Sequence, residues 1–250
     1  MPSAHPTLLL ASASPARRSA LVAAGVEPLV RVSSVDEDDV VAAAEAGQGR
    51  LAAADVALLL ARAKAEDVVT ALEHDVLDVD HGGSAVDGDR AGGTVDDGGR
   101  RDDPDDGGLI VLGCDSVLEL DGEVHGKPAD AGEAVERWRR MRGRTGHLHT
   151  GHWLVDLRDG PQGGSGGMVG GTATTTVYFA AVDDAEVDAY VATGEPLQVA
   201  GAFTLGGLGG PYVAGIEGDP SNVVGVSLPF VRDLLRELGV TWHDLRRPTR

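Results

Sequence analysis

The chain has almost none of the sulfur and none of the long apolar runs that mark disulfide-bonded or membrane proteins. Cys114 is the single cysteine among 250 residues, so neither an internal disulfide nor a zinc cage of several thiolates can form. No apolar run approaches the roughly 18 residues that a membrane helix needs. The N-terminal apolar stretch is interrupted by Glu27 and Pro28 and does not fit an export signal. We therefore expect a cytoplasmic protein without a membrane partner.

Positive charge and aromatic side chains are also scarce. The 40 acidic residues outnumber 21 basic ones, the net charge is −19, and Trp, Tyr and Phe occur three times each. Proteins that grip a nucleic-acid backbone have the opposite charge balance, so nucleic acid is excluded as the main partner. A chain of 250 residues can nevertheless bury the core of one sizeable domain.

Lysine is the rarest charged residue. Of the 21 basic residues, only Lys64 and Lys127 are lysines. Because the chain uses arginine elsewhere, these two lysines indicate positions that require a compact ammonium group. Binding a phosphate oxygen as a point charge is such a task. The alternative is that chance left two lysines behind.

Two segments are rich in glycine and poor in apolar residues. The stretch 75–108 contains eleven Asp, nine Gly and three Arg, and 158–171 is a second glycine-rich piece. Such segments bury too little to offset the entropy of ordering, so we expect flexible loops there. For the first segment, an acidic metal-binding loop is the alternative, although its Asp spacing lacks a calcium-loop pattern.

Between these segments, strand and helix patterns alternate, which favours an α/β layered domain. Ser14 and Pro15 are typical of a helix start, and Asp130 with Glu133 forms a capping-box pattern. We expect strands over 7–11, 109–120 and 171–182 and helices over 15–25, 53–72, 130–143 and 228–238.

The turn after the first strand is the first candidate for chemistry. A strand that runs into a helix N-terminus directs free backbone N–H groups at whatever lies above the turn. Ser12 and Ser14 add hydroxyl groups, and Arg17 and Arg18 add positive charge suited to phosphate. The alternative is a capped helix with two solvated arginines.

Asp115 is the second candidate. We expect it at the carboxyl end of a buried strand, where open α/β sheets usually hold their ligands. There its carboxylate could bind a divalent cation or accept a proton from water. Capping the next turn is the alternative role. The neighbouring Cys114 is expected to be a small core residue rather than a nucleophile.

Other polar residues give weaker signals. The acidic run 36–39 is typical of a solvated helix start, with one carboxylate available as a second metal ligand. His147, His149 and His152 lack paired ligand spacing, so we expect scattered surface histidines on a strand. The sequence contains no GxxxxGK[ST], GxGxxG or GxSxG motif.

Six segments in chain order resemble the Maf family of nucleoside triphosphate pyrophosphatases. They are ASASPARRSALVAAGV, the pair Asp36–Glu37, LLLARAKA, GCDSVLELDGEVHGKPADAGEAVERW, YVATGEPLQVAGAF and GDPSNVVGVSLP. The resemblance implies an α/β fold with two lobes around a central mixed sheet and a nucleotide cleft, related to the inosine triphosphate pyrophosphatases. Residues 1–250 would then be a single Maf-like domain with flexible insertions at 75–108 and 158–171.

The same resemblance implies hydrolysis of a nucleoside triphosphate, with a canonical or a noncanonical base, to the monophosphate and pyrophosphate with Mg²⁺ or Mn²⁺. It assigns Asp115 as proton acceptor and metal ligand and Glu37 as a second metal ligand. The implied substrate-binding residues are Ser12, Arg17, Lys64 and Lys127. A homodimer is compatible with it. The alternative is a nucleotide-binding regulatory module that acts in cell-division control through a protein partner.

The sequence departs from one subgroup of this family. Members that prefer thymidine and uridine triphosphates typically read SPRR, an Asp-Thr pair and a glutamine in the late AGAYGIQG segment. Here those positions hold Ala16, Ser116 and Gly206. The resemblance therefore implies the phosphate and metal groups without the base contacts of that subgroup.

Overall fold

The computed structural model describes residues 5–81 and 106–246 and has an α/β architecture. Within these residues, seven strands form one mixed sheet in the order β2–β1–β3–β5–β6–β7, with β4 added beside β3. The strands are β1 (His5–Ala11), β2 (Leu29–Val30), β3 (Asp106–Leu120), β4 (Glu123–His125), β5 (Thr145–Asp156), β6 (Met168–Phe179) and β7 (Val213–Glu217). β1 is parallel to β2 and β3, and the other pairs are antiparallel.

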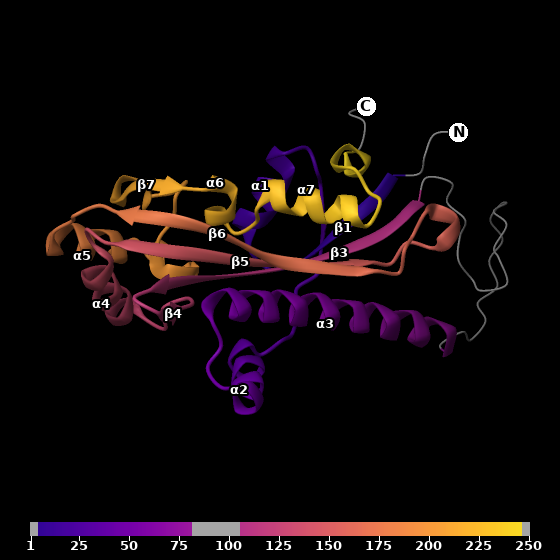
Figure 1. Cartoon of the computed structure of the whole chain (residues 1–250), viewed down its shortest axis with the longest axis horizontal. Helices are drawn as coiled ribbons and strands as arrows, with labels where there is room; N and C mark the ends of the chain where they lie inside the picture. The colour runs from indigo at the N-terminus through magenta and orange to yellow at the C-terminus, as the bar shows by residue number, and fades with distance from the viewer. Residues whose placement is uncertain (1–4, 82–105, 247–250) are drawn as a thin grey trace, which may run out of the picture.

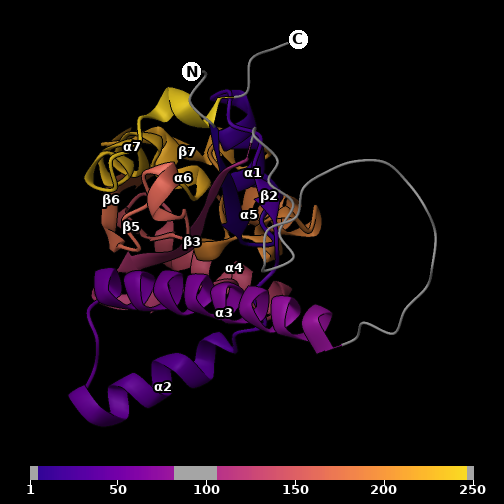
Figure 2. The ribbon, with the colours of Figure 1, turned by 90° about the vertical axis from the view of Figure 1, so that its right-hand side faces the viewer.

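Helices cover the sheet on both faces, as Figures 1 and 2 show. On one face lie α1 (Pro15–Ala23), α6 (Pro220–Val224) and α7 (Leu228–Glu237). On the other face lies α3 (Ala53–His81), with α2 (Glu37–Gln48) outside it. Fully buried Leu8, Leu10 and Leu112 belong to the apolar cluster that α1 and α7 share with the sheet. The predicted α/β layering is confirmed.

The start of α1 follows the sequence prediction closely. Ser14 is the N-cap, its hydroxyl accepts from the Arg17 N–H, and Pro15 is the first helical residue. The helix ends at Ala23, before Gly25 with φ +86°. β1 therefore leads into α1 through a short turn of three residues, 12–14.

Two glycines allow α3 to lie close against the sheet. A Cβ at Gly113 of β3 would come within 2.1 Å of the Ala61 carbonyl oxygen, and one at Gly151 of β5 within 2.1 Å of the Ala57 carbonyl oxygen. Only glycine fits at such close approaches. The small residues of α3 and these two glycines together set the height of the helix above β3 and β5.

Both predicted loops have different boundaries in the structure. α3 continues to His81, and β3 begins at Asp106, so both ends of 75–108 are regular structure. Residues 82–105, and with them most of this prediction, lie outside the described residues.

In the second segment, β6 already begins at Met168. The Asp156 carboxylate accepts hydrogen bonds from Arg158 and Ser165. Buried Arg158 also donates to the Leu238 carbonyl. The expected glycine-rich loop 158–171 is therefore held by buried hydrogen bonds of Arg158 at its start, and its last residues belong to strand β6.

A second lobe is built on the far end of the antiparallel strands. It contains α4 (Ala131–Met141) and α5 (Asp184–Ala192), and its core centres on Trp138, which is 1% exposed. Asp130 caps α4 by accepting from the Glu133 N–H, whereas the Glu133 carboxylate binds the Ala129 N–H one residue before the cap. The predicted capping box is thus shifted by one residue on one side.

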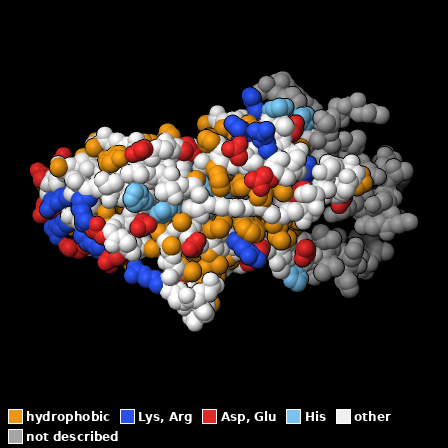
Figure 3. Space-filling model, viewed as in Figure 1, with side chains coloured by type: hydrophobic (Ala, Val, Ile, Leu, Met, Phe, Trp, Pro, Cys, Tyr) orange, Lys and Arg blue, Asp and Glu red, His pale blue; other side chains and the backbone are white. Residues whose placement is uncertain are grey.

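The surface over α4 and α5 carries intermixed charges, visible at the left of Figure 3. Arg140 pairs with Glu123 at 2.6 Å, and Arg142 pairs with Asp184 at 2.6 Å. Because the arginines are neutralised by neighbouring carboxylates, this surface is not a basic patch of the kind that binds nucleic acid. No helix in the described part of the chain is long and apolar enough to cross a membrane.

Candidate active site

The site lies at a notch in the edge of β3. On the edge away from β5, β1 pairs with β3 as far as Gly113, and β4 pairs from Leu118 onward. Residues 114–117 have no strand partner on that side, which leaves a gap of about 13 Å at about 3.3 Å per residue. The β1–α1 turn borders the notch at one end and β4 at the other.

Asp115 lies in this notch, in the middle of β3. The sequence had predicted it at the carboxyl end of a strand. The parallel ladder with β1 ends just before it, so Asp115 still occupies the ligand-binding end of the parallel part of the sheet. The alternative role as a turn cap is wrong, because β3 continues to Leu120.

Lys64 connects Asp115 with Glu37. Its Nζ lies 2.5 Å from Asp115 Oδ1 and 2.7 Å from Glu37 Oε1. Lys64 reaches up from α3, and Glu37 comes from the first turn of α2, after the N-cap Asp36. Three residues predicted separately from the sequence therefore form one acidic cluster, in which the carboxylates of Glu37 and Asp115 both contact the Lys64 ammonium.

The Asp115 carboxyl has a shifted pKa. Burial raises its pKa above the ordinary value, whereas the charges of Lys64 and Arg17 act in the opposite direction. A carboxylate with a raised pKa is a stronger proton acceptor near neutral pH. Asp115 therefore has the chemistry of a general base as well as that of a metal ligand.

Arg17 lies on the other side of Asp115 and is held by neutral acceptors alone. Its Nε donates to the Gly225 carbonyl at 2.8 Å, its Nη1 to Ser12 Oγ at 2.8 Å and its Nη2 to Ser116 Oγ at 3.1 Å. The residue is 9% exposed, and it forms no ion pair with any described carboxylate. Buried charges are normally paired, so this guanidinium is suited to an anionic ligand.

The alternative of two solvated arginines is half right. Arg17 is buried, but Arg18 is exposed and pairs with Glu27 on the surface. Ser12 joins the site as the acceptor for Arg17 and also accepts from the Ser14 N–H. Ser12 and Arg17 are therefore the two side chains of this turn that are buried and bonded to each other beside the notch.

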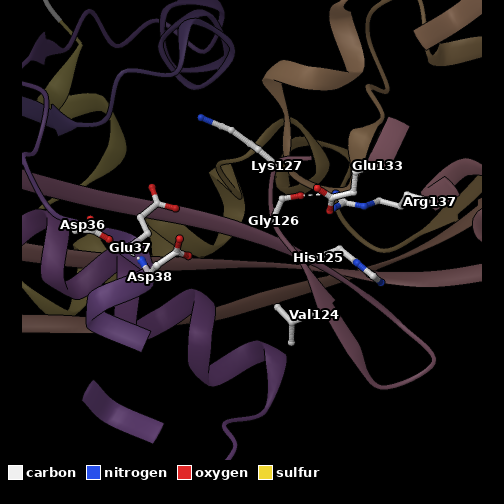
Figure 4. A pocket seen from close by; sticks show the side chains of 9 residues that line it. All are labelled: Asp36, Glu37, Asp38, Val124, His125, Gly126, Lys127, Glu133 and Arg137. Carbon is white, nitrogen blue, oxygen red and sulfur yellow. Dashed lines mark hydrogen bonds and ion pairs between the residues drawn. The ribbon is translucent and has the colours of Figure 1, made fainter. Parts of the chain in front are cut away.

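Lys127 stands at the opposite end of the notch, on an open cleft of about 480 Å³. Figure 4 shows Lys127 extending from the turn after β4, across the cleft from Glu37. The cleft is lined by Asp36, Glu37, Asp38, Val124, His125, Gly126, Lys127, Glu133 and Arg137. Lys127 is exposed and has no partner among the described residues, so its ammonium is available to a ligand in the cleft.

Glu37 and Asp115 fit a divalent cation only together with a ligand. No group of three or more His, Cys, Asp or Glu side chains in the described ranges could hold a metal by itself. Each of the two carboxylates gives one oxygen to Lys64 and keeps the other without a partner among the described residues. Mg²⁺ is commonly bound by one or two carboxylates plus substrate phosphates and water, and this donor set matches that pattern.

Two predictions about other polar residues have different outcomes. Cys114 is fully buried, and burial raises the pKa of its thiol to about 12, which confirms a core role. The expectation of surface histidines is wrong for two of three. His149 is buried and contacts Thr174 and Glu119, and fully buried His152 accepts from the Ser227 N–H. Of these three histidines, His147 alone is exposed.

Sequence reasoning missed the residues that fix the position of Arg17. Ser116 and Gly225 accept hydrogen bonds from its guanidinium, and Thr150 and Asn222 bind to these acceptors. Their contacts cross 34 to 208 residues of sequence, so no local pattern reveals them. The only available signal was the segment GDPSNVVGVS, where an amide follows a helix-starting Asp-Pro pair. A polar residue there that turns inward cannot be distinguished by spacing from one that turns outward.

The chain is similar to known proteins over nearly its whole length. The family described as Maf-like protein matches residues 7–238. A nucleoside triphosphate pyrophosphatase of Leifsonia xyli subsp. xyli is 48% identical over 238 residues, which cover 95% of each chain. Namesakes from Salinispora tropica and Nocardia farcinica are 48% and 46% identical, and cover 93% and 98% of this chain and 84% and 99% of their own.

Proposed function

Because this chain belongs to the Maf-like protein family, we propose that it is a nucleoside triphosphate pyrophosphatase, a hydrolase that releases nucleoside monophosphate and pyrophosphate. The observation that carries the proposal is the notch in β3, where the buried Asp115 carboxylate lies between Arg17, a cation held by neutral acceptors, and the ion pair of Lys64 with Glu37. This arrangement fits a phosphate chain that brings a divalent cation with it.

The phosphate chain binds along the notch. The guanidinium of Arg17 has five N–H groups, and three of them are used by Ser12, Ser116 and Gly225. The remaining two, one on each terminal nitrogen, donate to phosphate oxygens. Lys127 approaches from the other end of the gap and binds the chain as a point charge.

Asp115 takes the proton of the attacking water. The water oxygen forms a bond with the α-phosphorus. At the same time the bond from that phosphorus to the oxygen that bridges the α- and β-phosphates breaks, and pyrophosphate leaves. The proton passes to the Asp115 carboxylate, whose raised pKa suits it to this step. Arg17 and Lys127, whose charges have no carboxylate partner among the described residues, stabilise the negative charge that gathers on the departing group.

We assign Glu37 and Asp115 as the residues that hold Mg²⁺ or Mn²⁺. When bound, the cation polarises the phosphoryl centre and lowers the pKa of the attacking water. Lys64 keeps the two carboxylates together before the metal and the nucleotide arrive. The single buried cysteine fits a reducing compartment, and we place the reaction in the cytoplasm.

The test is a product analysis. Purified protein is incubated with standard and base-modified nucleoside triphosphates plus Mg²⁺ or Mn²⁺. Both kinds of base are included because Ala16, Ser116 and Gly206 depart from one subgroup of the family. Monophosphate and pyrophosphate in equal amounts are expected. Diphosphate with inorganic phosphate, or no turnover of any nucleotide, would overturn the proposal.

A further inference from the structure

The strongest unassigned feature is a chain of hydrogen bonds that leads away from Arg17 into the core. Arg17 Nη2 donates to Ser116 Oγ at 3.1 Å, and Ser116 Oγ lies 3.0 Å from Thr150 Oγ1. Thr150 Oγ1 in turn lies 3.0 Å from the main-chain carbonyl oxygen of Asn222. Thr150 and Asn222 are 0% exposed. Neither can touch a nucleotide in the notch, and general packing alone would not require polar side chains there.

The direction of every proton in this chain is fixed. A carbonyl can only accept, so Thr150 must donate its one hydroxyl proton to Asn222. Ser116 must then donate its own proton to Thr150, which leaves the Ser116 lone pairs for the Arg17 guanidinium. Thr150 thus determines which way the Ser116 hydroxyl points.

Asn222 anchors the far end of the chain. Its side-chain nitrogen lies 3.2 Å from the carbonyl oxygens of Leu148 and Ala173 and 3.1 Å from Thr175 Oγ1, so it spans β5 and β6. The main-chain carbonyl of Asn222 also accepts from the Gly225 N–H at 3.0 Å. The end of α6 is therefore fixed to the sheet through one buried amide.

The same turn supplies a second hold on Arg17. The Gly225 carbonyl accepts from Arg17 Nε at 2.8 Å. Gly225 has φ +112°, a conformation that favours glycine, and a Cβ there would lie 3.0 Å from Arg17 Nε, so another residue would strain the turn and press on Arg17. Two of the three contacts of the guanidinium thus depend on where Asn222 sits.

We propose that Thr150 and Asn222 are positioning residues, which act through Ser116 and Gly225 to orient Arg17 toward the phosphate chain. This inference rests on the proposed function, in which Arg17 binds the triphosphate. A guanidinium misplaced by about 1 Å loses up to about a hundredfold in rate. Loss of one of three holds is expected to cost about tenfold in kcat/KM.

A double-mutant cycle tests the inference. Thr150→Val keeps the shape and removes the hydroxyl, and the Asn222 carbonyl still has Gly225 as a donor. We expect Thr150→Val to lower kcat/KM about tenfold with Arg17 present, and less than about twofold in an Arg17→Ala background. Thr150→Ser, which restores the hydroxyl, should stay within about twofold of the parent. An equal loss in both backgrounds would overturn the positioning role.

The matched control is Thr172→Val. The Thr172 hydroxyl also donates to a backbone carbonyl, that of Ala54 at 2.8 Å, but it faces α3 and not Arg17. It should leave kcat/KM unchanged within about twofold, and an equal tenfold loss there would overturn the proposal. If Thr150→Val does not fold, Ser116→Ala breaks the same chain from a half-buried position, with the same expected cycle.

Binding measurements separate this inference from the proposed function. Calorimetry with pyrophosphate and Mg²⁺ measures the affinity of the notch without any turnover. If the parent releases no pyrophosphate from any nucleotide, the proposed function fails, and the cycle is repeated on the dissociation constant of pyrophosphate. A tenfold weakening by Thr150→Val that disappears without Arg17 supports the positioning role in either case, and additive effects refute it.

Discussion

The two cations beside Asp115, half-buried Lys64 and buried Arg17, are held in opposite ways. The Lys64 side chain is 12% exposed and lies between two carboxylates, so its charge is already neutralised by the protein. Arg17 is 9% exposed and is bound by two hydroxyls and one carbonyl, so its charge has no counterion among the described residues. Glu37, Lys64 and Asp115 together form a side with net negative charge, and Arg17 forms a positive one.

This difference explains how a strongly acidic protein could take an anionic substrate. Net charge acts over the whole surface, but at contact distance the local partners decide. The negative side of the notch suits a divalent cation, and the positive side suits phosphate oxygens. A metal–triphosphate complex presents both, so it would be oriented along the notch before any chemistry occurs.

Removing Asp115 should have the largest effect. Asp115→Asn takes away the proposed proton acceptor and one metal oxygen, and we expect kcat to fall about a thousandfold. The melting temperature should not fall, because burial raises the pKa of Asp115 and thereby disfavours its charge in the fold. Steady-state kinetics and thermal unfolding check this. Retention of more than about a tenth of the activity would remove Asp115 from its role.

Exchanging the two kinds of cation tests the comparison directly. Lys64→Arg brings a planar fork between Asp115 and Glu37, where a compact ammonium now fits, and we expect about a hundredfold loss of kcat/KM. Arg62→Lys, on the same helix, is the control, since Arg62 is exposed and pairs with Glu66. It should change kcat/KM less than twofold and stability by less than about 1 kcal/mol. Equal activity of Lys64→Arg and the parent would make the lysine dispensable.

Part of this arrangement was predictable from the sequence. The β1–α1 turn, the cap at Ser14 and the strand around Asp115 follow from local rules of propensity and capping, and the structure confirms them. Lys64 stood out as one of two lysines, and Glu37 belonged to the acidic run 36–39. The meeting of both on Asp115 depends on the height of α3 over the sheet, which Gly113 and Gly151 set through contacts distant in sequence.

Other features could not be predicted because they depend on long-range contacts. The neutral hold on Arg17 requires that the end of α6, which lies 208 residues away, return to the β1–α1 turn. The burial of His149 and His152 follows from the order of strands, which places β5 in the middle of the sheet. A single strand pattern does not show which of its faces will be covered.

Glu37→Gln sharpens the comparison on its acidic side. Glu37 would lose its metal oxygen while Lys64 keeps Asp115, so we expect the Mg²⁺ concentration for half-maximal activity to rise about tenfold. The kcat at saturating Mg²⁺ should change less than about threefold. Asp39→Asn, in the same exposed first turn of α2, is the matched control and should leave the Mg²⁺ dependence unchanged. Equal Mg²⁺ dependence of Glu37→Gln and the parent would exclude Glu37 as a ligand.

The smallest expected effect concerns the neutral surroundings of Arg17, which include His152. Burial and the charge of Arg17 lower the pKa of His152 from 6.5 to about 3. Below pH 6.5 the unfolded chain therefore binds a proton on His152 that the folded chain does not. In that range the free energy of unfolding should therefore decrease as the pH is lowered, by about 1.4 kcal/mol per pH unit.

His152→Gln keeps an acceptor for the Ser227 N–H and has no proton to gain. Urea unfolding at pH 7.5 and pH 5.5 should show that the parent loses about 1.4 kcal/mol more than this variant, because only the lower value lies below the unfolded pKa. Asp115, whose raised pKa acts in the opposite direction, is common to both proteins and cancels in the difference. An equal loss in parent and variant would mean that His152 is protonated in the fold, and that Arg17 is not surrounded by neutral groups alone.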